Sequence, residues 1–270
     1  CEYCDESVVS NAKLTDGKLT HTLWGFVQTD TFMSIEDVTL TGSELDNVIT
    51  ATFFTVGGVT IKGEDGNDTI VGTSYNDVLH GGNGADKLFG GSGDDSLHGD
   101  DDVDILFGGN DSDTLFGGKG DDHLSGDSGN DILYGGLDDD DLYGQSGDDI
   151  LFGGKGTDYL YGGTHNDQLL GGEGVDYLYG ENGNDGLFGG AGIDFLSGDV
   201  GMDRYLYQTG DFTAGYLTSS DVKIKFEGTP TSTTINVDGE DCVYTAAAWS
   251  DEEVQVVDEA LAVLQEKQGN

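Results

Sequence analysis

Basic side chains, proline and long apolar runs are scarce in this chain of 270 residues, which contains a single Pro. Ten Lys and Arg residues stand against 53 Asp and Glu residues, which gives a formal net charge of −43. No basic patch is available to neutralise phosphates, so nucleic acid is excluded as a partner and anionic membranes are disfavoured. No apolar run is long enough to span a bilayer as a helix. The acidic excess is typical of disordered chains, but 12 Phe and 12 Tyr residues argue against simple disorder.

Cysteine is also rare, with only Cys1, Cys4 and Cys242 in the chain. If the protein is secreted, an odd number of cysteines favours a free thiol or an intermolecular disulfide. Cys242 is separated from the other two by the whole repeat region described below. We therefore hypothesise that Cys1 or Cys4 of one molecule bonds to Cys242 of the next, which would link molecules head to tail into filaments.

A nine-residue repeat fills the middle of the chain without insertion. Residues 63–206 divide into 16 consecutive units, each with Gly first and Asp sixth, and with Leu eighth in all but the two end units. Residues 81–89 (GGNGADKLF) show the pattern G-G-x-G-x-D-x-L-x. A fixed short period predicts a solenoid in which each unit is one structural step. A carboxylate that returns after every glycine-rich turn predicts that this solenoid is built around cations.

Each unit is interpreted as a six-residue turn followed by a very short strand. Glycine permits the positive φ angles of tight turns, and Asp or Asn tolerates the same geometry. In the following x-L-x segment, strand alternation places Leu on one face and its two neighbours on the other. Sixteen inward side chains, from Ile70 and Leu79 to Leu196 and Tyr205, are therefore expected to form the core.

The repeat resembles the RTX (repeats-in-toxin) calcium-binding nonapeptide of secreted bacterial toxins, proteases, lipases and surface proteins. The resemblance covers 144 of the 270 residues. It implies an all-β fold, a parallel β-roll solenoid of about eight coils with two nonapeptides in each. It also implies that calcium lies in the turns, between units n and n+2, bound by the sixth-position Asp side chains and by backbone carbonyls. Roughly a dozen Ca²⁺ ions are expected, and without them residues 63–206 are expected to be largely unfolded.

The calcium ligands implied by the resemblance share the sixth position of the repeat. They are Asp68, Asp77, Asp86, Asp95, Asp104, Asp113, Asp122, Asp131, Asp140, Asp149, Asp158, Asp167, Asp176, Asp185, Asp194 and Asp203. In stacked coils these carboxylates would lie in rows at a spacing of ~5 Å and would repel one another without cations.

Departures from the pattern indicate where individual turns differ. The fourth position holds Tyr75, Asp102, Asp111, Asp138 or His165 in place of Gly. Asp suits a left-handed backbone, whereas Tyr75 and His165 do not, so their turns are predicted to be strained or altered. Asn or Asp fills the fifth position mainly in even-numbered units. Because even and odd units would lie on opposite edges, the two calcium rows are predicted to differ in affinity.

The flanks lack the repeat and complete a division into four segments. Residues 1–62 are predicted to form an N-terminal β cap with short strands near 38–40, 48–52 and 59–61. Residues 63–206 form the roll, and residues 207–249 a C-terminal β cap. Residues 250–270 are predicted to form an amphipathic helix, because Ser250 and Glu253 make a capping box and apolar residues follow at helical spacing.

Nothing in the sequence indicates an enzyme, because H-E-x-x-H is absent and no G-x-S-x-G occurs between a strand and a helix. The histidines, which are His21, His80, His98, His123 and His165, are scattered. Two functions stay open. The first is a secreted, extracellular or cell-surface structural or adhesive protein that folds on calcium and assembles into filaments or a surface layer. The second is a calcium-dependent secretion and folding module of a larger toxin or hydrolase. Aromatic residues at outward positions either form ladders along the sheet or provide an adhesive face.

Overall fold

The structure is a computed structural model that describes residues 9–15, 18–23, 37–52 and 57–207, together with short strands at 212–214, 222–225, 231–237 and 240–246. Side chains are described for residues 38–52 and 57–206. These parts of the chain contain strands, turns and bends but no helix. The predicted helix at 250–270 lies outside the described residues, as do Cys1, Cys4 and the side chain of Cys242.

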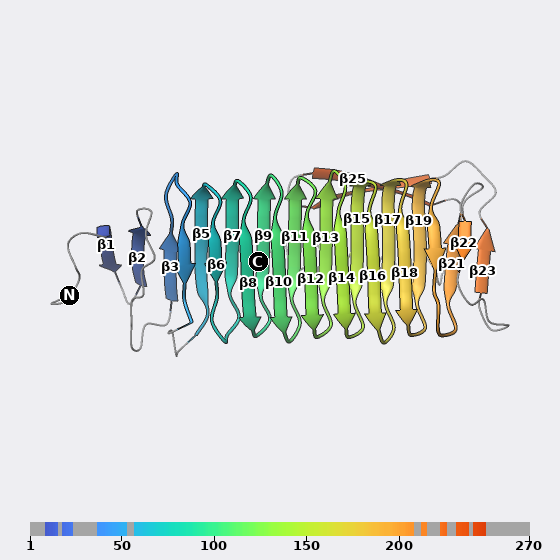
Figure 1. Cartoon of the computed structure of the whole chain (residues 1–270), viewed down its shortest axis with the longest axis horizontal. Helices are drawn as coiled ribbons and strands as arrows, with labels where there is room; N and C mark the ends of the chain where they lie inside the picture. Colours follow the sequence, from blue (N-terminus) through green and yellow to red (C-terminus); the bar gives the residue numbers. More distant parts are fainter. Residues whose placement is uncertain are drawn as a thin grey trace. The chain divides into compact units, whose positions relative to one another are not determined.

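The chain divides into two compact units, residues 1–132 and 133–270. In the first unit the two sheets have the orders β1-β2-β3-β5-β7-β9-β11 and β4-β6-β8-β10-β12. These strands are β1 (Val9–Thr15), β2 (Lys18–Leu23), β3 (Asp37–Thr41), β4 (Val48–Thr50), β5 (Val59–Asp65), β6 (Thr69–Val71), β7 (Val78–Asn83), β8 (Lys87–Ser92), β9 (Ser96–Asp101), β10 (Ile105–Asn110), β11 (Thr114–Lys119) and β12 (His123–Ser128). From β3 onward, consecutive strands alternate between the two sheets and run in opposite directions (Figure 1), whereas β1 and β2 lie in the same sheet as β3.

The second unit repeats this arrangement. Its sheets have the orders β13-β15-β17-β19-β21-β23 and β14-β16-β18-β20-β22, and β24 and β25 form a separate antiparallel hairpin. The strands are β13 (Ile132–Leu137), β14 (Asp141–Ser146), β15 (Ile150–Gly156), β16 (Tyr159–Thr164), β17 (Gln168–Gly174), β18 (Tyr177–Asn182), β19 (Gly186–Gly192), β20 (Phe195–Ser197), β21 (Arg204–Tyr207), β22 (Phe212–Ala214), β23 (Val222–Lys225), β24 (Thr231–Val237) and β25 (Glu240–Ala246). Strand β25 contacts β17 and β19.

Within each compact unit, a parallel register of 18 residues relates neighbouring repeat strands of one sheet. Leu79 is paired with Leu97 in the first unit, and Leu160 with Leu178 in the second. Eighteen residues are two nonapeptides, so the coil of two repeats that the resemblance implied is confirmed. The fold is an all-β parallel β-solenoid with about nine turns counted along the chain.

The solenoid begins before the regular repeat does. Strands β3, β4 and β5 were expected from the sequence as short strands of a cap, and they pair in parallel with the repeat strands. The register between β3 and β5 and between β4 and β6 is 21 residues, since Leu40 is paired with Ile61 and Ile49 with Ile70. The first coil therefore carries three more residues than the coils that follow. This insertion hides residues 42–50 (GSELDNVIT) from a search for a strict period of nine.

The repeat strands are longer than the sequence predicted. Most have six or seven residues, such as β8 (Lys87–Ser92), which joins the last three residues of one unit to the first three of the next. The prediction of a six-residue turn and a three-residue strand was therefore wrong in extent. The first-position glycine belongs to the strand, where no side chain would fit. A Cβ at Gly81 would collide with Asp86 Oδ2 and with the carbonyl oxygen of Gly99.

The core consists of the eighth-position side chains, as predicted. Leu79, Leu88 and Leu160 are completely buried, and Tyr205 is 1% exposed. Burial of each such leucine contributes about 1.5–3 kcal/mol. One coil supplies only two of these side chains, so the stability of the roll depends on stacking.

Candidate metal-binding turns

The sixth-position aspartates lie at the point where each turn meets the next strand. Asp86, Asp95 and Asp104 directly precede β8, β9 and β10, and all three are no more than 2% exposed. All the other aspartates of this position are equally buried. Buried carboxylates are costly unless hydrogen bonds or cations compensate them, so their partners define the site.

In each compact unit, one carboxylate oxygen of most of these aspartates joins a ladder along an edge of the roll. The backbone N–H of Asp68 donates to Asp86 Oδ1 at 2.6 Å, and that of Asp86 donates to Asp104 Oδ1 at 2.7 Å. The opposite edge has the same arrangement, in which the N–H of Asp95 donates to Asp113 Oδ1 at 2.8 Å. Each carboxylate in the ladder is therefore held in a fixed orientation by the preceding coil.

The second carboxylate oxygen, Oδ2, accepts no hydrogen bond at a group of these positions. The group comprises Asp68, Asp86, Asp95, Asp104, Asp113, Asp158, Asp167, Asp176 and Asp185. Because a Cβ at Gly81 would meet both Asp86 Oδ2 and the Gly99 carbonyl oxygen, these two oxygens face the same space. A carboxylate oxygen without a donor and a main-chain carbonyl oxygen thus converge there.

Burial raises the pKa of these carboxyl groups in the absence of a cation. Desolvation is the main cause, and backbone hydrogen bonds oppose it only in part. The pKa of Asp86 rises to about 7 and that of Asp104 to about 9. Neighbouring members of the row add to the rise, since Asp86 and Asp122 both act on Asp104. The row therefore disfavours its own ionised form unless positive charge is supplied.

The donor set fits calcium. Ca²⁺ prefers six to eight hard oxygen ligands and accepts a mixture of carboxylates and backbone carbonyls. The ten Lys and Arg residues of the chain are too few to neutralise its 53 acidic residues. In the described parts of the chain, no three His, Cys, Asp or Glu side chains form a group that could hold a metal ion. An ion bound in a row would therefore need the backbone carbonyls as well.

Left-handed backbone at the second and fourth positions shapes the turns. Asp102, Asp111 and Asp138 have φ angles of 78°, 75° and 77° at the fourth position, as the sequence predicted. His165 is forced to a φ of 89°, which confirms the predicted strain. Tyr75 is not among the residues with positive φ, so its turn is altered rather than strained.

The two edges differ in the fifth position. On the even edge, Asn76 Oδ1 accepts from the N–H of Asp94 at 3.1 Å, and Asn166 Oδ1 accepts from that of Asn184 at 3.0 Å. These side chains form a second ladder outside the aspartate row. On the odd edge the same contact occurs where the N–H of Thr157 donates to Asp139 Oδ1 at 2.7 Å, but apolar residues such as exposed Val175 offer no acceptor and interrupt the ladder. The edges are therefore structurally unequal, and their difference in calcium affinity stays a prediction.

The turn at residues 72–77 differs from its neighbours. Asp77 Oδ2 accepts from the N–H of Thr73 at 2.5 Å, and Asp77 Oδ1 from Thr73 Oγ1 at 3.0 Å. The N–H of Val59 also donates to Asp77 Oδ1 at 2.7 Å. Thr73 Oγ1 accepts in turn from the N–H of Tyr75 at 3.1 Å. The Asp77 carboxylate thus has a donor on each oxygen, which sequence analysis missed.

A related turn occupies residues 42–47, at the start of the opposite edge. Asn47 lies where the repeat would place Asp, and its N–H donates to Asp68 Oδ1 at 2.6 Å. Its Oδ1 accepts from the N–H of Ser43 at 2.7 Å. Its Nδ2 donates to Ser43 Oγ at 3.1 Å and to the carbonyl oxygen of Leu45. These contacts fix the orientation of the amide and place an N–H₂ group inside the turn.

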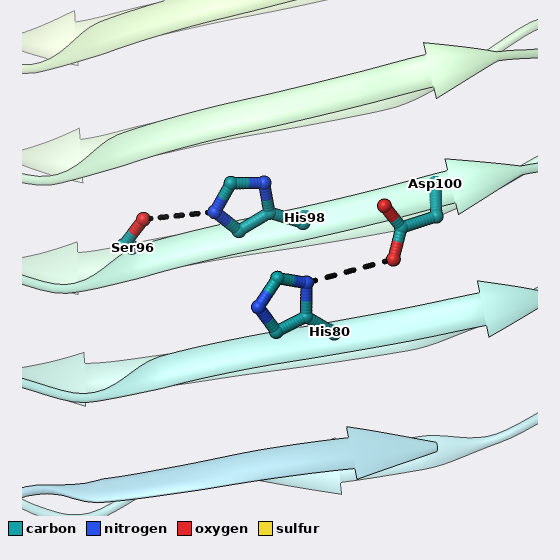
Figure 2. Close-up of polar contacts among 4 residues, drawn as sticks. All are labelled: His80, Ser96, His98 and Asp100. Carbon is teal, nitrogen blue, oxygen red and sulfur yellow. Dashed lines mark hydrogen bonds and ion pairs between the residues drawn. The ribbon is translucent and has the colours of Figure 1, made fainter. Parts of the chain in front are cut away.

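The histidines do not form a metal site in the described part of the chain. The rings of His80 and His98 stack with centroids 4.5 Å apart and an angle of 15° between them. Figure 2 shows His80 Nδ1 near Asp100 Oδ2, at 3.6 Å, and His98 Nε2 near Ser96 Oγ, at 3.1 Å. Lone pairs lie in the planes of such rings, so those of two nearly parallel rings do not converge on one ion. His80 and His98 are therefore a stacked surface pair.

Outward aromatic residues form ladders along the sheet. Tyr161 stacks on Tyr143 at 4.8 Å and on Tyr179 at 5.0 Å. The adjacent column stacks Tyr159 on Tyr177 at 4.6 Å. The ring faces are covered by neighbouring rings, so they are poorly placed to stack on a sugar ring. Edges and hydroxyl groups remain for other contacts.

Comparison with known proteins gives one match. A family model described as the RTX calcium-binding nonapeptide repeat, in four copies, matches residues 62–97, 98–133, 125–160, 134–169 and 161–196. Together these matches cover residues 62–196, which is half of the chain. No curated protein matches the sequence. No helix long and apolar enough to cross a membrane occurs in the described residues.

Proposed function

Since the chain belongs to the family of RTX calcium-binding nonapeptide-repeat proteins, we propose that this calcium-binding β-roll acts outside the cell as a structural or adhesive protein. The observation that carries the proposal is the pair of buried aspartate rows, in which Oδ2 atoms that accept no hydrogen bond face main-chain carbonyl oxygens. Such rows suit a chain that stays unfolded at low calcium and becomes rigid where calcium is abundant. No catalytic role is proposed.

In this proposal the sixth-position aspartates and the carbonyl oxygens of the glycine-rich turns hold roughly a dozen Ca²⁺ ions. The bound ions supply the positive charge that the rows lack. The protein's own part is to fix each carboxylate through the Oδ1 ladder and to exclude water by burial. Binding and folding are then coupled, because the unfolded chain does not bring these oxygens together.

The calcium dependence is tested by circular dichroism with a chelator and with millimolar calcium. We expect little β signal in the chelator and full β signal with calcium, because uncompensated rows repel one another. Magnesium at the same concentration is the control, since it requires smaller octahedral sites and keeps its waters. An equal β signal with calcium and with chelator would contradict the proposal.

The assembly is tested separately. If Cys1 or Cys4 of one molecule is joined to Cys242 of the next, secreted material in calcium should give ordered filaments by electron microscopy. It should also give oligomers on non-reducing gels that reduction converts to monomer. A Cys242→Ser variant is the matched control. Monomer on both gels would refute the disulfide, and dispersed monomers beside a catalytic fragment would favour a folding module of a larger toxin or hydrolase.

A further inference from the structure

Two turns at the N-terminal end of the roll depart from the site just described. These are the turns at 42–47 and 72–77, which lie on opposite edges. Both have a hydroxyl residue at the second position, Ser43 or Thr73, and Thr73 is the only Ser or Thr among the 16 second positions of the regular repeat. In both turns, the second-position N–H donates to the sixth-position side chain.

At the even edge, the comparison is between Asp77 and Asp95, which are one coil apart. Both are buried, and both accept at Oδ1 from the N–H 18 residues earlier. Asp95 Oδ2 has no hydrogen-bond partner, whereas Asp77 Oδ2 accepts from Thr73. Thr73 is the one second-position residue of the 16 units that is absent from the left-handed residues. The turn has therefore rotated its N–H toward the carboxylate oxygen that would otherwise face a cation.

At the odd edge, the sixth-position residue itself differs, because Asn47 stands where the repeat has Asp. Asn47 is 3% exposed and occupies the ladder position of an aspartate, next to Gly42 and the carbonyl oxygen of Gly63. Its neutral amide brings two donors of its own, and Nδ2 already contacts the Leu45 carbonyl and Ser43 Oγ. Asn47 Oδ1, which faces the same space as the Gly63 carbonyl oxygen, already accepts from the N–H of Ser43. A cation there would have to displace this donor and would meet one negative charge fewer.

We propose that the turns at 42–47 and 72–77 bind no calcium, and that protein donors take the place of the cation where each calcium row begins. In the even row the first calcium carboxylate is then Asp95, and in the odd row it is Asp68. This rests on the proposed calcium binding by the other turns. The two N-terminal turns close the rows through hydrogen bonds that do not depend on the calcium concentration.

The test counts calcium ions per chain by native mass spectrometry of the full protein at saturating calcium. Asp77→Asn should leave the number of ions unchanged, whereas Asp95→Asn, the matched control one coil away, should lose at least one. Loss of an ion in the Asp77→Asn variant would overturn the inference. If the wild-type chain binds no calcium at all, the proposed function fails instead, so the two failures are distinguishable.

A gain-of-site variant tests the same point independently. Thr73→Gly with Tyr75→Gly converts the turn to G-G-S-G-N-D and should add one calcium ion per chain. His165→Gly is the control, because its turn already has left-handed geometry and should gain none. An unchanged ion number in the folded double variant would overturn the inference. If the double variant does not fold, the comparison of Asp77→Asn with Asp95→Asn still tests whether the turn at 72–77 binds calcium.

Discussion

At the scale of single residues, the roll tolerates side chains at glycine positions when they can hold a left-handed backbone. Asp102 and Asp138 replace the fourth-position glycine at φ angles near those of typical left-handed residues. His165 reaches a φ of 89° with a bulkier ring. Tyr75 avoids the region altogether because Thr73 supplies another way to close the turn. Replacement of the fourth-position glycine therefore has two outcomes. The new residue either adopts the left-handed backbone, or the turn closes through a different set of hydrogen bonds.

We expect His165→Gly to stabilise the calcium-loaded protein by about 1 kcal/mol, because a non-glycine residue in this region costs about 1–3 kcal/mol and glycine recovers part of it. Denaturant unfolding in saturating calcium measures the change. Gly156→Ala is the opposite control, since Gly156 has a φ of 143° and a Cβ there would strike the Asp138 carbonyl. A less stable His165→Gly protein would contradict the strain argument.

At the scale of strands and rows, the coil is held by an inner column of leucines and two outer ladders. Leu160 is completely buried and lies beside Leu142 and Leu178 in adjacent strands. The next residue, Tyr161, faces outward and stacks between two other tyrosines. Leu160 and Tyr161 thus stabilise the coil by different means. Leu160 acts through burial, and Tyr161 acts through ring stacking.

Leu160→Ala should destabilise the loaded protein by about 2–5 kcal/mol, because it opens a cavity in a column that neighbouring coils cannot close. Tyr161→Ala should cost less, about 0.5–1.5 kcal/mol from lost stacking together with some lost area. Chemical denaturation of both variants in saturating calcium gives the comparison. Equal losses would show that the outer ladder carries as much stability as the core.

The rows make the calcium-free protein sensitive to pH. Because the pKa of Asp86 rises to about 7 and that of Asp104 to about 9, the folded calcium-free state binds more protons than the unfolded state between about pH 4 and pH 9. Its free energy of unfolding therefore falls as pH rises through this window. We expect β structure in chelator to increase as pH is lowered from about 8 to about 5, as measured by circular dichroism. An increase with rising pH instead would contradict the burial of these carboxyl groups.

The period of nine was enough to predict a solenoid, its leucine core and the location of the aspartates, and the resemblance to the RTX repeat implied the parallel all-β roll. The strand lengths were not predictable, because glycine pairs are typical of turns and only the absence of space at Gly81 shows that they lie in a strand. The early start of the solenoid was missed because three extra residues break the period. The Thr73 contacts were missed because a threonine at the second position looks like an ordinary substitution.

At the scale of the whole molecule, charge and fold are linked through calcium. Sixteen of the 53 acidic residues form the two buried rows, and in the proposed function calcium neutralises them, so assembly of the roll and neutralisation of its edges are one process. In the proposed function, the calcium concentration around the chain therefore determines whether the roll folds. Adhesion or filament formation would follow only after calcium has fixed the outer ladders in place.

The uniform register of 18 residues has a consequence for how the roll avoids mispairing. Sliding one part of the roll past another by a whole coil would again place leucine on leucine and aspartate on aspartate, so most contacts cannot distinguish the correct pairing from its neighbour. When several registers have nearly equal energies, some local feature must select the correct one. The first coil has 21 residues, and this coil and the next each contain one turn with unique side-chain partners. This end of the roll therefore fits in one place only, and it sets the register of every later coil.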